Sequence, residues 1–198
     1  MAPKLSEDEI EDLIYCARAG EDAELTETVA ALAEREKVTP AEVIIAVKDE
    51  SRKSTILHMA AGNGHLETVR KLLGYFAERP SDEKQAFLDE PNEHGNTGLH
   101  WAALGGHLAV VKLLMEQGAS PALANEQNYV PLDLANFNDK KDVAQHFLAS
   151  AGMLEEENQA EGLAAQTAGV EIEDDGKDER YDGVDSKQEA TKTEDNSS

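Results

Sequence analysis

Apolar residues recur in two different patterns along the middle of the chain. Residues 99–105, LHWAALG, form a short run of small and apolar residues, and residues 107–117, HLAVVKLLMEQ, place apolar residues every three or four positions. The second spacing is that of a helix with one apolar face. A glycine follows each run, at Gly106 and Gly118, and glycine is a common C-terminal cap. With the polar turn at 92–96 before them, these residues predict a turn followed by two short helices.

The same arrangement occurs a second time, 42 residues earlier in the chain. Ten positions agree at this single offset, and the matched segments run from Thr55 to Leu72 and from Thr97 to Leu114. Weaker copies lie on either side of these two. One unit cannot bury its own apolar side, whereas stacked neighbours can, so we expect an all-α stack of four units. The predicted units lie near 7–35, 51–77, 92–124 and 125–150, with inserts near 36–50 and 78–91.

Each insert contains a segment that predicts a helix. In TPAEVIIAV (39–47), Thr39 is the expected N-cap and Pro40 the first helical residue, a position that proline favours. In SDEKQAFL (81–88), Ser81 is the expected N-cap. We therefore expect extra helical turns between neighbouring units.

The stretch GNTGLHWAALGGHLAVVKLLMEQGASP (95–121) resembles the ankyrin repeat over about 27 residues. The second unit matches the same motif less completely, with Ile56 where proline is usual, and Gly98 departs in the same way in the third. The first unit has EDLI in place of the TPLH motif. The resemblance implies a short ankyrin solenoid of about four repeats, with degenerate outer repeats acting as caps.

Charge and composition limit the classes of partner and the compartment. The chain has 41 acidic and 18 basic residues and a net charge of −23, which disfavours direct binding to nucleic acid and favours a basic protein partner. Segment 151–198 holds 15 acidic and 4 basic residues and few large aliphatics. We predict that it is a disordered acidic tail after a repeat domain at 1–150. A single cysteine, Cys16, rules out an intrachain disulfide and indicates a reducing compartment. The sequence shows no signal peptide and no membrane span, so we expect the protein in the cytosol or nucleus. We also expect it to be a monomer.

Four histidines are the first candidates for chemistry: His58, His65, His100 and His107. A metal site would need them to converge, yet His58 and His65 lie in different parts of one unit, separated by a glycine. The ankyrin resemblance implies a structural role instead. The histidine after leucine bonds across neighbouring turns, and the histidine after glycine begins the second helix.

Nucleophilic catalysis is also disfavoured by the pattern. Thr55 and Thr97 precede the leucine-histidine pairs at helix N-cap positions, and Cys16 takes the core position that Ala60 takes in the second unit. The phosphate-binding motif G-x-x-x-x-G-K-[ST] is absent. We therefore expect no enzyme activity, no cofactor and no metal.

A wider resemblance covers about residues 7–150. The chain resembles yeast ankyrin-repeat chaperones dedicated to a small-subunit ribosomal protein. The segments that carry this resemblance are CARAG (16–20), STILHMAAGNGHLETVR (54–70) and GNTGLHWA (95–102), with an insert between the last two and an acidic tail. This implies binding of a newly made basic KH-domain protein of the S-three family. The chaperone shields the client's basic N-terminal helix, keeps it soluble and escorts it to the nucleus for small-subunit biogenesis. The alternatives are a generic ankyrin adaptor in transcription or proteasome assembly and, less favoured, a histone chaperone that relies on the tail.

The resemblance also implies a partner-binding surface. The variable contact positions of the repeats are Ser51, Arg52, Ser54, Asn63, Glu93, His94, Asn96, Leu104, Glu126, Gln127 and Tyr129. We add Trp101, Phe137 and Asn138 on the first helices, and Glu7, Asp8 and Arg18 near the start of the chain, where SEDEIEDL (6–13) is expected to precede the first helix. Trp101 either anchors a partner or packs against neighbouring first helices. The two acidic clusters, SEDEIEDL and DEPNEHG (89–95), either contact a partner or serve solubility.

Overall fold

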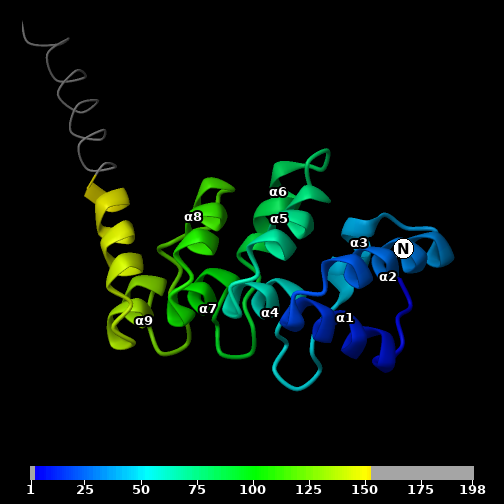
Figure 1. The fold of residues 1–198 in the computed structure, drawn as a ribbon, viewed down its shortest axis with the longest axis horizontal. Helices are drawn as coiled ribbons and strands as arrows, with labels where there is room; N and C mark the ends of the chain where they lie inside the picture. Colours follow the sequence, from blue (N-terminus) through cyan, green and yellow to red (C-terminus); the bar gives the residue numbers. More distant parts are fainter. Residues whose placement is uncertain (1–2, 153–198) are drawn as a thin grey trace, which may run out of the picture. The chain divides into compact units, whose positions relative to one another are not determined.

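The computed structural model describes residues 3–152, and these form successive pairs of α-helices (Figure 1). The four pairs are α1 (Glu7–Ala19) with α2 (Asp22–Glu36), α4 (Ile56–Gly62) with α5 (Leu66–Gly74), α7 (Gly98–Gly105) with α8 (Leu108–Glu116), and α9 (Pro131–Phe137) with a helical stretch at 141–152. Within residues 3–152 the only bridge of β type is an isolated one between Lys48 and Thr55. The all-α repeat prediction is confirmed. Of the predicted disordered tail, residues 151–152 are helical and the rest lies outside the described residues.

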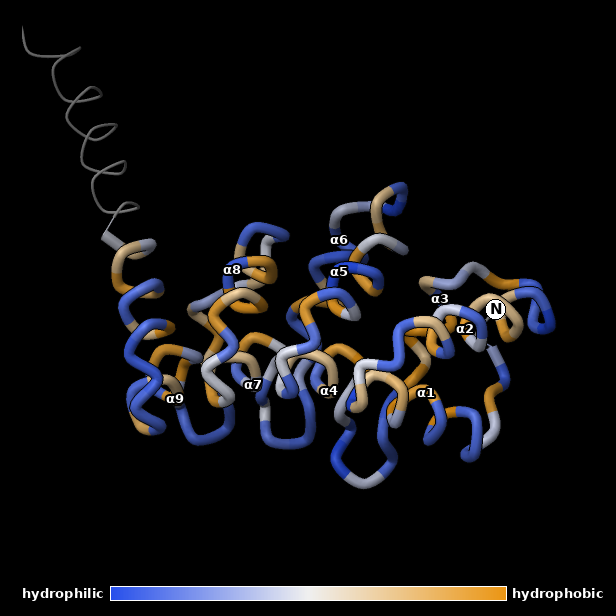
Figure 2. Tube along the Cα trace, in the orientation of Figure 1, coloured by the Kyte–Doolittle hydropathy of each residue, from blue (hydrophilic) through white to orange (hydrophobic). Residues whose placement is uncertain are grey.

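The first helices of the pairs form one layer. α1, α4, α7 and α9 pack side by side in that order, and α5 packs against α8 in a second layer (Figure 1). The helices of the first layer pack closely against one another because alanines occupy their contact positions. Ala17, Ala60, Ala102 and Ala135 are fully buried, and a methyl group lets two helix backbones approach closely. Figure 2 shows the turns before α7 and α9 as hydrophilic, and the buried apolar residues of the repeats form one continuous core cluster.

Hydrogen bonds of the caps fix where the helices begin. Ser6 caps α1 by accepting from the amide of Glu9, whose carboxylate accepts in return from the Ser6 amide. The expectation that SEDEIEDL precedes the first helix is therefore wrong, since Glu7 already begins α1. Thr39 caps α3 (Pro40–Ala46) as predicted.

The insert helix α6 begins at Ser81 rather than after it, and Pro80 is its N-cap. The prediction that Ser81 is the N-cap is wrong by one residue. The proline carbonyl already accepts from the amides of Glu83 and Lys84, at 3.2 and 3.3 Å, so the first turn closes without a side-chain cap.

The two inserts tie neighbouring repeats together through side chains. Arg79 Nη1 donates to Thr39 Oγ1 at 3.0 Å, which joins the two inserts, and Lys48 forms an ion pair with Glu90. On the other side of α6, Gln85 Nε2 donates to the carbonyl of Gly118 at 2.9 Å. The inserts therefore brace the second and third repeats.

Candidate functional site: a groove along the first helices

The four histidines join adjacent repeats. The backbone N–H of Thr55 donates to His58 Nδ1 at 3.1 Å, so Nδ1 carries no proton and Nε2 must donate to the carbonyl of Asn96, 2.7 Å away. His100 repeats this arrangement with Thr97 and the carbonyl of Tyr129. Each ring thus links a helix N-terminus to the polar turn of the next repeat. Desolvation by burial lowers the pKa of His58 to about 4 and also lowers that of His100, so both rings are neutral at neutral pH.

The second pair of histidines links the turns between helices. His65 and His107 are the N-caps of α5 and α8. Their Nε2 atoms lie 2.8 Å from the carbonyl of Arg18 and 2.9 Å from the carbonyl of Gly62, each in the preceding repeat. The structural interpretation of the histidines is therefore confirmed.

A groove of about 1020 Å³ lies between α1, the polar turn at 49–52, α4 and α7. Its walls carry five carboxylates and two guanidinium groups, namely Glu7, Glu11, Asp12, Asp49 and Glu50 against Arg18 and Arg52. Its apolar lining comes from Ile10, Ile14, Tyr15, Met59 and Trp101, with Ser51 and Asn63 completing it. The excess of carboxylates makes the groove acidic, so it attracts basic groups.

One of these carboxylates is held in a fixed place. Asp49 accepts from the amides of Ser51 and Arg52, at 3.1 and 3.3 Å, and from the Ser51 hydroxyl. Burial raises the pKa of the Asp49 carboxyl, but these hydrogen bonds outweigh it and hold the pKa below its ordinary value of 3.8. Asp49 therefore stays ionised and shapes the turn that forms one wall.

Trp101 packs against a neighbouring first helix and also lines the groove. Its ring lies over Gly62 of α4, where an added Cβ would come within 2.7 Å of Trp101 Cε3, and it meets the His58 ring edge-on at 5.9 Å. The side chain is nevertheless half-buried and lines the groove. It is thus packed on one face and open to the groove on another.

The repeat register explains one groove residue that the sequence prediction missed. Tyr15 is 59% exposed and takes the position in the first repeat that Met59 and Trp101 take in the second and third. Glu7 and Glu11 share its helix face, because residues four apart on a helix lie one above the other. The repeat offsets of 44 and 42 residues contained this signal, but the first unit lacks the TPLH motif that would have drawn attention to it.

The structure brings together only some of the predicted contact residues. Glu7, Arg18, Ser51, Arg52, Asn63 and Trp101 line the groove. Ser54 does not, because its side chain is fully buried and its hydroxyl has no hydrogen-bond partner. Ser54 is therefore unavailable to a partner in this conformation, and we leave it out of the surface.

The remaining predicted residues lie outside this groove. Tyr129 and Phe137 meet edge-to-face at 5.0 Å, and Phe137 is 62% exposed. Asn96 is half-buried and bonded to Asn125, which gives it a part in holding the polar turns together. The other predicted residues outside the groove are exposed, namely Asp8, Glu93, His94, Leu104, Glu126, Gln127 and Asn138.

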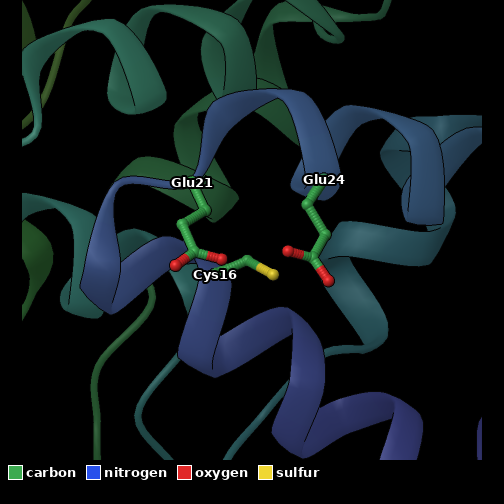
Figure 3. Close-up of side chains that lie close together, drawn as sticks. All are labelled: Cys16, Glu21 and Glu24. Carbon is green, nitrogen blue, oxygen red and sulfur yellow. The ribbon is translucent and has the colours of Figure 1, made fainter.

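Cys16 has two acidic neighbours that the sequence did not predict. Figure 3 shows its thiol near the carboxylates of Glu21 and Glu24, with ligand atoms of all three within 4.8 Å of one another. Burial and the nearby carboxylates raise the pKa of the Cys16 thiol. The neighbouring Glu21 side chain raises the pKa of the Glu24 carboxyl. The thiol is therefore protonated at neutral pH and a weak nucleophile.

Comparison with known proteins places these repeats in a family. A family model for ankyrin repeats in three copies matches residues 13–125 and 84–158. The chain belongs to the ankyrin-repeat family. Among ankyrin-repeat proteins, it is 37% identical over 177 residues to the ankyrin repeat-containing protein YAR1 of Saccharomyces cerevisiae, and the alignment covers 85% of this chain and 86% of that protein.

A solved structure of an ankyrin-repeat protein is also similar. It is the crystal structure of the yeast ribosomal protein Rps3 in complex with its chaperone Yar1, matched with a TM-score of 0.67 and 36% identity over 74% of this chain and 95% of that chain. The palmitoyltransferase AKR1 of Debaryomyces hansenii is 30% identical over 103 residues, which are 52% of this chain and 12% of that enzyme. The similarity to YAR1 therefore spans most of both proteins, whereas the similarity to the enzyme covers a small part of it.

Among the described residues, every helix is too short or too polar to cross a membrane.

Proposed function

We propose that this chain is a non-catalytic chaperone of an S3-family ribosomal protein. It binds the client's basic N-terminal helix while the client is newly made, keeps the client soluble and escorts it from the cytoplasm to the nucleus for small-subunit biogenesis. The observation that carries this proposal is the similarity to YAR1, at 37% identity over 85% of this chain, together with the likeness to the Rps3–Yar1 complex.

The groove gives the proposal a physical basis. Five carboxylates against two arginines suit a helix rich in lysine and arginine, and the apolar lining with Tyr15 and Trp101 suits the apolar face of the same helix. An amphipathic helix lying in a groove is a common mode of peptide recognition. The carboxylates steer the encounter and set its specificity, while the aromatic rings provide anchors of the kind that dominate binding energy.

The exposed residues outside the groove extend this surface along the repeats. We propose that Leu104, Tyr129 and Phe137 cover apolar parts of the client, and that Asn96 and Asn138 border them. We further propose that the acidic and polar residues Asp8, Glu93, His94, Glu126 and Gln127 face the client's basic rim. The acidic tail then competes with RNA for the basic surface that the client leaves uncovered.

The decisive experiment is a titration with a peptide of the N-terminal helix of the S3-family ribosomal protein, followed by Trp101 fluorescence and by calorimetry. We expect saturable binding that weakens between about 0.05 and about 0.5 M salt, because salt screens exposed charges. Tyr15→Ala and Glu11→Gln/Asp12→Asn variants should weaken it. Trp101→Ala should abolish it by calorimetry, provided that circular dichroism shows the variant to be folded.

Two control variants separate the groove from general effects. Leu148→Ala removes an exposed apolar side chain on the last helical stretch, and Glu27→Gln removes one negative charge from α2, outside the groove. Both should bind the peptide as the natural chain does. If the natural chain fails to bind the peptide and the whole client protein at both salt concentrations, the client assignment is wrong and the adaptor alternative gains support.

A further inference from the structure

Two arginines line the acidic groove without forming an ion pair among the described residues. Arg18 and Arg52 line it among five carboxylates, yet neither guanidinium forms an ion pair within 4.0 Å with any carboxylate of residues 3–152. Arg18 Nη2 instead lies 3.6 Å from the sulfur of Met59, on the wall shared with α4. The backbone amide of Arg52 donates to Asp49 and its carbonyl accepts from the amide of Glu93. The charge of Arg52 also helps to lower the pKa of the Asp49 carboxyl, although the two side chains form no ion pair within 4.0 Å.

These arginines oppose the attraction that the carboxylates create. A groove that accepted any polycation would bind more tightly without them, because like charges repel across the same short distances over which opposite charges attract. Specificity is a difference between two affinities, and a repulsive group can supply it as well as an attractive one. The presence of two arginines in an acidic groove is therefore explained if the correct partner carries a negative group that binds to them.

We propose that Arg18 and Arg52 select a partner segment that is basic but carries a carboxylate side chain. This inference rests on the proposed function and names the chemistry of the segment that the groove accepts. The guanidinium of arginine forms planar, paired hydrogen bonds with a carboxylate. A partner that carries a carboxylate therefore gains binding affinity from the arginines, whereas a uniformly basic segment is repelled by them. The groove thus distinguishes its client from other highly basic proteins.

The positions along α1 say where on the partner the carboxylate belongs. Glu7 and Glu11 occupy the first two turns of α1, and Arg18 its last turn. At a rise of 1.5 Å per residue, Arg18 lies about 10 Å beyond Glu11 along the helix axis. A client helix that follows α1 therefore places its lysines and arginines over the first turns, and its carboxylate about two turns away.

A structural role for Arg18 predicts a different result. As a cation in the last turn of α1, it also complements the helix dipole, and its removal then lowers stability while changing binding of all basic ligands in one direction. Selection by the arginines predicts changes of opposite sign for two ligands, which stability alone cannot produce.

The experiment compares two ligands on the full chain by calorimetry at about 0.1 M salt. The ligands are the S3-family ribosomal protein and an oligolysine as long as its N-terminal helix. The variants are Arg18→Gln, Arg52→Gln and the double substitution. The control is Arg70→Gln, which makes the same change in net charge as either single substitution, on the outer helix α5, where Arg70 is exposed and lies 3.6 Å from Glu67.

We expect the double variant to bind oligolysine about five-fold more tightly and the ribosomal protein about five-fold more weakly. Arg70→Gln should change both affinities by less than about two-fold. The inference is overturned if the double variant binds the ribosomal protein as tightly as, or more tightly than, the natural chain. A natural chain that does not bind the ribosomal protein at all overturns the proposed function instead, so the two failures are distinguishable.

Discussion

At the scale of single residues, the repeats are held together by side chains that do two jobs at once. The buried ring of His100 accepts from the amide of Thr97 within its own repeat and donates to the carbonyl of Tyr129 in the next. In the fourth repeat Asp133 caps its own helix by accepting from the amide of Val130, at 3.0 Å. Asp133 thus reproduces the first of the two His100 hydrogen bonds, the one within the repeat.

Replacing His100 with alanine should lower the free energy of unfolding by about 2–4 kcal/mol. The substitution leaves the Thr97 amide and the Tyr129 carbonyl without their partner and opens a cavity at a fully buried position. Urea denaturation followed by circular dichroism measures the change. His94→Ala is the matched control, since the His94 side chain is 63% exposed, and it should change stability by less than about 0.5 kcal/mol. Equal effects of the two substitutions would contradict this role for His100.

Stability should also fall as the pH falls from about 6.5 to about 4. The pKa of His58 is near 4 in the folded chain and 6.5 in its ordinary state, so the unfolded chain binds the proton first and acid favours unfolding. The contribution is complete above pH 6.5, and His58 alone accounts for a loss of about 3 kcal/mol at pH 4. His100 shifts in the same direction.

Urea unfolding at closely spaced pH values tests this dependence. Glu9 does not interfere at the upper end of the range, because its hydrogen bond with Arg35 lowers its pKa from 4.5 to about 2. Its contribution is therefore lost only at lower pH. His58→Gln removes one of the two shifted histidines and should flatten the profile between pH 6.5 and 5. An unchanged slope in that variant would show that His58 does not cause it.

The sequence predicted individual contact residues unevenly, for reasons that lie in the packing. Trp101 was placed on an inner helix by its motif, but its half-buried state depends on Gly62, which has no side chain to hold the ring away. Ser54 sits at a variable position of the repeat, yet the hydrogen bond from the Asp49 amide to the Ser54 carbonyl closes the turn and leaves the side chain inside. Such effects come from neighbours in space, which the repeat motif does not specify.

At the scale of the elements, the turn between the helices of each of the first three pairs depends on a glycine and on the next repeat. Gly64 has a φ of +77°, and a Cβ there would lie 2.5 Å from His107 Nδ1. Gly64→Ala should therefore lower the free energy of unfolding by about 2 kcal/mol, through backbone strain and displacement of the His107 ring. Thermal and urea denaturation measure it.

Gly74 provides the contrasting case at the end of α5. An added Cβ there meets nothing within 4 Å, and alanine favours the helix over glycine. Gly74→Ala should raise the free energy of unfolding by about 0.5 kcal/mol. If Gly74→Ala also lowered the free energy of unfolding, the difference in local packing between the two glycines would not explain their effects on stability.

The sequence predicted the helices better than the contacts between the inserts. The pattern of apolar residues and the Thr39 cap located α3, and the acidic segment at the start proved to be the first turns of α1 because Ser6 caps it. The bonds from Arg79 to Thr39 and from Gln85 to Gly118 join segments that are 40 and 33 residues apart. The periodicity of apolar residues is a local signal. It therefore predicts where a helix lies but not which distant segment the helix contacts.

At the scale of the whole molecule, the dominant property is the net charge of −23. The segment 153–198 holds 15 acidic and 4 basic residues, a net charge of −11, and thus nearly half of the total. Charges outside a binding groove act mainly on the rate at which a basic partner arrives, and salt screens them within about 10 Å at 0.1 M. The groove and the remainder of the chain should therefore affect different steps of binding.

Removing residues 153–198 should slow association with the basic client about ten-fold at low salt and leave the dissociation rate unchanged. Stopped-flow measurement of Trp101 fluorescence gives both rates, and at about 0.5 M salt the association rates of the two chains should converge because the long-range attraction is screened. A chain in which the acidic residues of 153–198 are replaced by their amides keeps the length and should behave as the truncated chain does. If truncation instead speeds dissociation, the segment holds the client by direct contacts, and its role is binding rather than steering.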